Sequence, residues 1–98
     1  MSRDKPGEMA EEMLGSRGRI RVLKVMSESG ELNISEVGRR TGLNYTSVER
    51  HLTKLSDMGL LREKRYGNIR IFEALFRRIS ISFVKNKGVE IEVEDKRI

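Results

Sequence analysis

Residues 44–58 carry polar hydrogen-bond donors at a spacing that an α-helix would gather on one side. Val48, Leu52 and Leu55 recur after four and three residues, so we expect a helix over residues 45–58 with an apolar inner face. The donors left on its outer side are Asn44, Tyr45, Thr46, Ser47, Arg50 and Lys54. Such a face has the chemistry to bind base edges and phosphates in a DNA groove.

Three of these side chains have distinct expected roles on B-DNA. Arg50 can form a bidentate pair with guanine, and Tyr45 can press against a thymine methyl group. Lys54 lies one helical turn beyond Arg50, where we expect it to contact phosphate. Base contacts specify a sequence, whereas phosphate contacts position the protein. Sequence reading would therefore depend most on Arg50.

The remaining reactive side chains form no catalytic or metal-binding set. The sequence has no cysteine and one histidine, His51, which excludes thiolate, disulfide and paired-histidine sites. His51 lies beside Leu52 in the expected helix. We therefore interpret it as a structural histidine or a neighbour of a DNA phosphate, not as a catalytic residue. Glu11 and Glu12 are adjacent acids that we interpret as a solvated helix face. The sequence contains no nucleophile–base motif or phosphate-binding loop, so we predict no enzyme activity, no cofactor and no metal.

Capping residues divide residues 34–61 into two helices joined by a tight turn. Ser35 can cap the first helix through its hydroxyl group. Gly42 suits the left-handed position at which that helix would end, and Asn44 can cap the second helix. Gly59 then marks the end of the second helix.

The two-helix unit and the segment after it also carry a family resemblance. The residues concerned are Ser35-Glu36-Val37 to Gly42-Leu43, Thr46 to Leu55, Met58 to Leu61, and Arg65 to Arg70. In these residues the chain resembles winged-helix transcription regulators of the archaeal ArsR-like kind, over roughly residues 15–72. The resemblance implies three core helices, a β-wing and binding to DNA. Metal sensors of the ArsR type use cysteine or paired-histidine sites, which this sequence lacks, so a metal-responsive role is not implied.

A second basic segment follows the two helices. Residues 60–65 and 69–73 are strand-like, and Tyr66, Gly67 and Asn68 supply turn chemistry. We expect this hairpin to be the wing and to contact the minor groove or its flanking phosphates through Arg65, Tyr66 and Arg70. Weaker candidates for contact with the DNA backbone are Arg17, Arg19, Arg39 and Arg40. Each of these cations, taken singly, is also compatible with plain surface charge.

Two helices are expected before this unit. Ser16 can cap a helix over residues 17–29. Its core-facing side chains would be Ile20, Leu23 and Met26, with Val22 beside them. Residues 8–14 predict a short helix whose apolar edge would be Met9, Met13 and Leu14, packed on the core or on a second subunit. We expect residues 1–7 to be a disordered tail.

The positive charge is concentrated in the middle of the chain. Residues 15–72 carry twelve Lys or Arg and six Asp or Glu, whereas residues 1–14 and residues 89–98 each have a net charge of −2. The net charge of +5 makes a polyanion a plausible partner. The absence of glutamine and the many charged residues hint at a thermophilic source. We expect an intracellular, nucleoid-associated protein, because no long apolar run or signal-peptide pattern is present.

The C-terminal segment alternates apolar and polar residues with period two. Residues 79–83 and 89–94 therefore predict a β-hairpin. Its apolar residues all lie on the same face of the hairpin only if Ile79, Ile81 and Phe83 pair with Val93, Ile91 and Val89. That register requires a three- or five-residue loop, or a bulge at Gly88. The alternative is a helix over residues 75–83, because Leu75, Ile79 and Phe83 recur every four residues.

Together these features predict an α+β winged helix-turn-helix domain over residues 8–74 and a C-terminal hairpin extension over residues 75–98. A lone hairpin is unstable in water, so its apolar face must cover the core or meet a second copy. The leading hypothesis is a homodimeric regulator that reads a pseudo-palindrome in double-stranded DNA, with no membrane partner. The alternatives are a sequence-neutral architectural chromatin protein and a winged helix that binds protein within a larger assembly.

Overall fold

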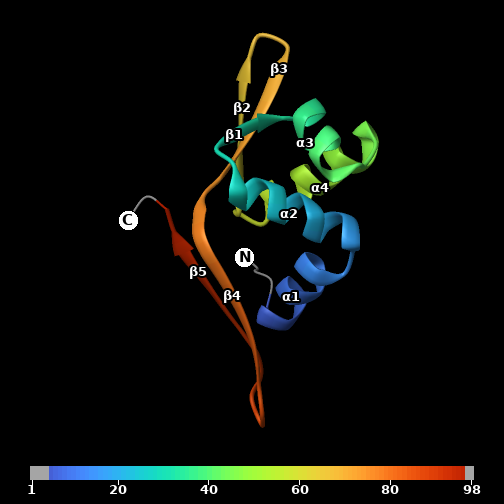
Figure 1. Cartoon of the computed structure of the whole chain (residues 1–98). Coiled ribbons are helices and arrows are strands. Elements are labelled where there is room, and N and C mark those ends of the chain that lie inside the picture. The colour runs from blue at the N-terminus through green and yellow to red at the C-terminus, as the bar shows by residue number, and fades with distance from the viewer. Residues whose placement is uncertain (1–4, 97–98) are drawn as a thin grey trace.

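The computed structural model describes residues 5–96, which form four helices and two antiparallel sheets (Figure 1). The helices are α1 (Pro6–Leu14), α2 (Arg17–Glu28), α3 (Ile34–Thr41) and α4 (Tyr45–Asp57). The strands are β1 (Glu31–Asn33), β2 (Leu61–Tyr66), β3 (Ile69–Ala74), β4 (Phe76–Val84) and β5 (Gly88–Asp95). This arrangement confirms the predicted α+β winged helix-turn-helix fold. No helix within residues 5–96 is long and apolar enough to cross a membrane.

Side-chain and glycine caps set the ends of the helices. Asn33, not Ser35, caps α3, because its Oδ1 accepts from Glu36 N and the Glu36 carboxylate accepts from Asn33 N, both at 2.8 Å. This reciprocal capping box satisfies two backbone donors, so α3 begins at Ile34 and the prediction for Ser35 was wrong. The structure confirms the predicted N-caps Ser16 and Asn44 and the left-handed glycines Gly42 and Gly59.

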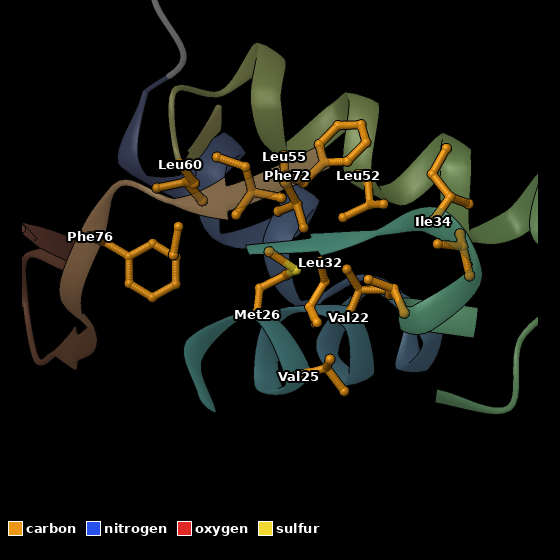
Figure 2. Close-up of a cluster of buried hydrophobic side chains, with 14 of the residues drawn as sticks. Val22, Val25, Met26, Leu32, Ile34, Leu52, Leu55, Leu60, Phe72 and Phe76 are labelled. Carbon is orange, nitrogen blue, oxygen red and sulfur yellow. The ribbon is translucent and has the colours of Figure 1, made fainter. Parts of the chain in front are cut away.

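The hydrophobic core lies between α2, α4 and the three-stranded sheet β1-β3-β2 (Figure 2). The predicted stripe of Val48, Leu52 and Leu55 is fully buried on α4. Figure 2 shows Leu52, Leu55 and Phe72 close together, with the labelled side chains of α2 on the other side of the cluster. On α2, Met26 is buried as expected and so is Val22 beside it. Val25 is also buried, whereas Ile20 and Leu23 are only half-buried at the edge of this face.

The first helix is longer than expected and packs against α2 and β5. It begins at Pro6, so Pro6 and Gly7 belong to α1 rather than to the tail expected over residues 1–7. Residues 1–4 of that tail lie outside the described residues. Met13 is buried as predicted, but Leu14 is exposed and Ala10 takes the inner position instead. The inner positions are three apart, which suits a helix that contacts the domain along a narrow stripe.

The C-terminal segment is the predicted hairpin, and the alternative helix over residues 75–83 was wrong. The observed pairs include Ile79 with Val93, Ile81 with Ile91 and Phe83 with Val89, which confirms the register. Residues 85–87 form a three-residue turn, followed by Gly88 in a left-handed conformation at φ 93°. The hairpin extends away from the wing, so the tips of the two hairpins lie at opposite ends of the molecule (Figure 1).

Candidate nucleic-acid interface

The outer face of α4 presents polar side chains opposite the core. Thr46, Arg50 and Thr53 are exposed and follow one another at helical spacing. Arg50 lies at the centre of this face, as the sequence predicted. Thr53 was missed, although its position three residues after Arg50 could have identified it. This face can offer one guanidinium and two hydroxyl groups to a groove.

The first turn of α4 lies beside the wing. Asn44 Oδ1 accepts from Ser47 N at 2.8 Å, so the Asn44 side chain holds the start of the helix. Tyr45 is exposed and borders a small hollow of about 190 Å³, together with Ser35 of α3 and Asn68 of the wing turn. The aromatic ring therefore stands where three segments of the winged helix meet. Sequence reasoning missed Ser35 and Asn68 as members of this surface.

Arg70 joins the wing to α4 instead of projecting from it. Its Nε donates to Glu63 Oε2 at 2.7 Å, and its Nη1 donates to Glu49 of α4. These carboxylates raise the pKa of Arg70, and the Arg70 hydrogen bond lowers the pKa of Glu63. The guanidinium also lies 5.7 Å from the centre of the Phe72 ring. The Arg70 side chain is only 20% exposed, so it positions the wing relative to α4.

Two other wing cations are bound to carboxylates at the base of the sheet. Arg62 Nη2 lies 2.6 Å from Glu73 Oε1, and Lys64 Nζ lies 3.3 Å from the same oxygen. Lys64 also pairs with Glu31 of β1. The hydrogen bonds from Arg62, and then those from Lys64, lower the pKa of Glu73 to about 2 even though burial opposes the shift. Much of the positive charge counted in the wing is therefore neutralised within the protein.

The tip of the wing presents a cation and two large side chains. Arg65 is 65% exposed, and its contact with Glu63 at 3.2 Å is a surface pair of little strength. Tyr66 and Ile69 are exposed and lie directly opposite each other across the two-residue turn. Ile69 was not among the predicted site residues. The tip can therefore enter a groove with both charged and apolar groups.

A network of polar contacts lies on the opposite flank of α4. Arg19 Nε donates to Nδ1 of the buried His51 at 3.2 Å, and its Nη1 donates to Glu12 Oε1 at 2.7 Å. Burial lowers the pKa of His51, and the nearby charges of Arg19 and Arg50 lower it further. Lys54 Nζ lies 3.7 Å from the other oxygen of Glu12. His51 and Arg19 thus connect α1, α2 and α4.

The remaining predicted cations are dispersed over α2 and α3. Arg17 is exposed at the start of α2, and Arg39 is exposed near Tyr45 beside a shallow hollow. Arg40 donates to Ser29 Oγ at 2.7 Å and borders a separate hollow between α2 and α3. Arg39 therefore belongs to the surface around α4, whereas Arg40 does not. Within residues 5–96, no group of three or more acidic or histidine side chains could hold a metal ion.

Solved structures with the same architecture are transcriptional regulators. The antimony-specific transcriptional repressor AntR shares 26% identity, with a TM-score of 0.60 over 76% of this chain and 73% of that chain. The PcaV regulator from Streptomyces coelicolor shares 19% identity, with a TM-score of 0.57 over 76% of this chain and 67% of that chain. The peroxide stress regulator of Campylobacter jejuni shares 18% identity, with a TM-score of 0.56 over 97% of this chain and 75% of that chain. The last two similarities concern the fold alone.

The sequence itself matches one family model and no curated protein. The match spans residues 16–81, from the N-cap of α2 through the wing and into β4. It therefore includes both helices of the two-helix unit, the wing and every candidate DNA-contacting residue. On this match, the chain belongs to the HVO_A0114 family.

Proposed function

We propose that this protein binds double-stranded DNA in a sequence-specific way and regulates transcription. The observation that carries the proposal is the outer face of α4, where Arg50 stands exposed between Thr46 and Thr53. The major groove of B-DNA admits one α-helix, and arginine reads guanine there through two parallel hydrogen bonds. In this pose Tyr45 and Ser47, in the first turn of α4, lie close to base edges and phosphates.

The wing gives the proposal a second contact. With α4 in the major groove, the wing tip would lie over the neighbouring minor groove or its phosphates. Arg65 would supply the charge, while Tyr66 and Ile69 would supply apolar contact. Arg70 would hold the wing at a fixed distance from α4 rather than contact DNA. Arg17 and Arg39 are candidates for further phosphate contacts.

We further propose that the regulator is a homodimer. The hairpin β4–β5 presents Phe83, which is 75% exposed, and Val93, also exposed, on its apolar face. Beside them lies a mainly apolar hollow of about 300 Å³ between α1, α2 and β4, lined by Leu14, Leu23 and Ile79 among others. A twofold-related copy would cover the same surface on both partners. The α4 helices of the two subunits would then recognise the two halves of an inverted repeat.

The ArsR-like kinship, the archaeal and thermophilic origin and the nucleoid location stay predictions from the sequence. A metal-responsive role is not part of the proposal.

Binding of a labelled 30-base-pair duplex at about 100 mM salt tests the proposal. A basic winged helix should still bind there, because its phosphate contacts release counterions. Arg50→Ala should weaken binding by roughly 5- to 150-fold, the equivalent of about 1–3 kcal/mol. Lys85→Ala removes a positive charge from the exposed turn of the β4–β5 hairpin and should change affinity little. Equal losses for the two variants would contradict a reading role for Arg50.

A further inference from the structure

Glu12 of α1 binds two of the cations that the sequence assigned to DNA phosphate. Its Oε1 accepts from Arg19 Nη1 at 2.7 Å, and its backbone carbonyl accepts from the same nitrogen at 2.8 Å. Its Oε2 lies 3.7 Å from Lys54 Nζ on α4. One carboxylate therefore spans a cation on α2 and a cation on α4.

The surroundings of Glu12 make this contact more than a single surface pair. The Arg19 side chain is only 13% exposed, because it also donates to the buried His51. A hollow of about 460 Å³ opens beside it, and its walls include Glu8, Glu11 and Glu12 as well as Arg19 and Lys54. A phosphate entering this hollow would meet three carboxylates along with the two cations.

We propose that α1 competes with DNA phosphate for the flank of α4. Glu12 neutralises Arg19 and Lys54 within the protein, so these cations add to duplex binding only when the Glu12 carboxylate no longer holds them. The proposal rests on the proposed function, because it concerns the same interface. Its physical basis is that each phosphate neutralised by a protein cation releases counterions and makes binding more dependent on salt. Cations already held by a carboxylate contribute no such release.

The consequence is that α1 sets how many phosphates the winged helix neutralises. Any event that lifts α1 from α2 and α4 would expose the two cations together, because one side chain holds both. The affinity for DNA would then rise at low salt without any change in the outer face of α4. Arg50 and Thr46 would read the same bases in either state.

The test is the salt dependence of duplex binding by the full chain, measured by fluorescence anisotropy from about 50 to 300 mM NaCl. Glu12→Gln keeps the size of the side chain and removes its charge. We expect the plot of log K against log salt to steepen by up to about 1.8, two phosphates at about 0.9 each, and affinity to rise roughly tenfold at the lowest salt. Glu28→Gln is the control, since it removes the same charge from an exposed position on α2 that does not border this hollow.

The possible outcomes separate this inference from the proposed function. A steeper slope for Glu12→Gln, with Glu28→Gln like the wild type, supports competition by α1. An unchanged slope for Glu12→Gln, or equal changes in both variants, overturns it while leaving DNA binding intact. Failure of every variant to bind the duplex overturns the proposed function itself.

A second substitution keeps the inference testable if Glu12→Gln does not fold. Lys54→Met removes a cation that is part-exposed and, in our account, already neutralised. The wild-type slope should therefore persist in Lys54→Met. A slope shallower by about 0.9 would show that Lys54 contacts phosphate in the wild type and would overturn the inference.

Discussion

Arg70 Nε donates to Glu63 Oε2 at 2.7 Å, while another nitrogen of the same guanidinium binds Glu49 on α4. The two carboxylates come from the wing and from the proposed recognition helix, so one side chain fixes the angle between them. A planar guanidinium suits this task, because it presents several donors in a fixed geometry. The most basic part of the sequence is thus partly structural.

Replacing Arg70 should destabilise the fold, whereas replacing Arg65 should not. Arg70→Met leaves Glu63 and Glu49 without their shared partner, which should lower the free energy of unfolding by about 1–2 kcal/mol. Arg65→Met removes an exposed cation and should change it by less than about 0.5 kcal/mol. Urea unfolding followed by circular dichroism measures both. Equal losses of stability would contradict the structural role of Arg70.

Glu73 should make stability depend on acid pH. Its pKa is about 2 in the folded protein, against an ordinary value of 4.5, so folding favours the charged form. The stabilisation is present above pH 4.5 and is lost as the pH falls towards 2. Its size should be on the order of 2 kcal/mol, since Glu73 is buried but its partner Arg62 is half-exposed and screened by solvent.

Thermal unfolding between pH 2 and 7 checks this contribution. Glu73→Gln should lose stability at neutral pH and show a weaker fall in its midpoint below pH 4.5 than the wild type. Glu28→Gln, at an exposed position on α2, is the control and should follow the wild-type curve. A Glu73→Gln curve parallel to the wild type over the whole range would contradict the assignment.

The exposed aromatic residue on the hairpin should control assembly. Phe83→Glu places a charge on the apolar face without disturbing the core, because Phe83 is 75% exposed. We expect a wild-type dimer at micromolar concentration and at least a tenfold higher dissociation constant for Phe83→Glu, measured by sedimentation velocity. Ser82→Glu adds the same charge to the opposite face of β4 and should leave the dimer intact. A monomeric wild-type protein would contradict the dimer proposal.

Local patterns in the sequence predicted the elements and the hairpin register. The register followed from the alternation of the two strands. Ile81 and Ile91 can pair on the same face only if the turn between the strands has an odd number of residues, and the observed turn has three. The N-cap of α3 was wrongly assigned to Ser35, although Asn33 is the cap. Glu36 stands three residues after Asn33, and this capping-box spacing identifies Asn33 as the cap.

The electrostatics of the site could not be predicted in the same way. Arg70 and Glu49 are 21 positions apart, and Lys64 and Glu31 are 33 apart, so these pairs exist only after the sheet and helices pack. Counting charges along residues 15–72 therefore overestimated the cations free to meet DNA. Arg50 was located correctly because its exposure depends only on helical periodicity.

Selection from random double-stranded DNA tests the central claim most directly. The wild-type chain should enrich one motif made of two inverted half-sites, their centres separated by about one helical turn or a multiple of it. Selection with Arg50→Ala should relax the motif at one position in each half-site. Tight binding at about 100 mM salt without any enriched motif would contradict sequence-specific reading by α4 and favour a sequence-neutral architectural protein.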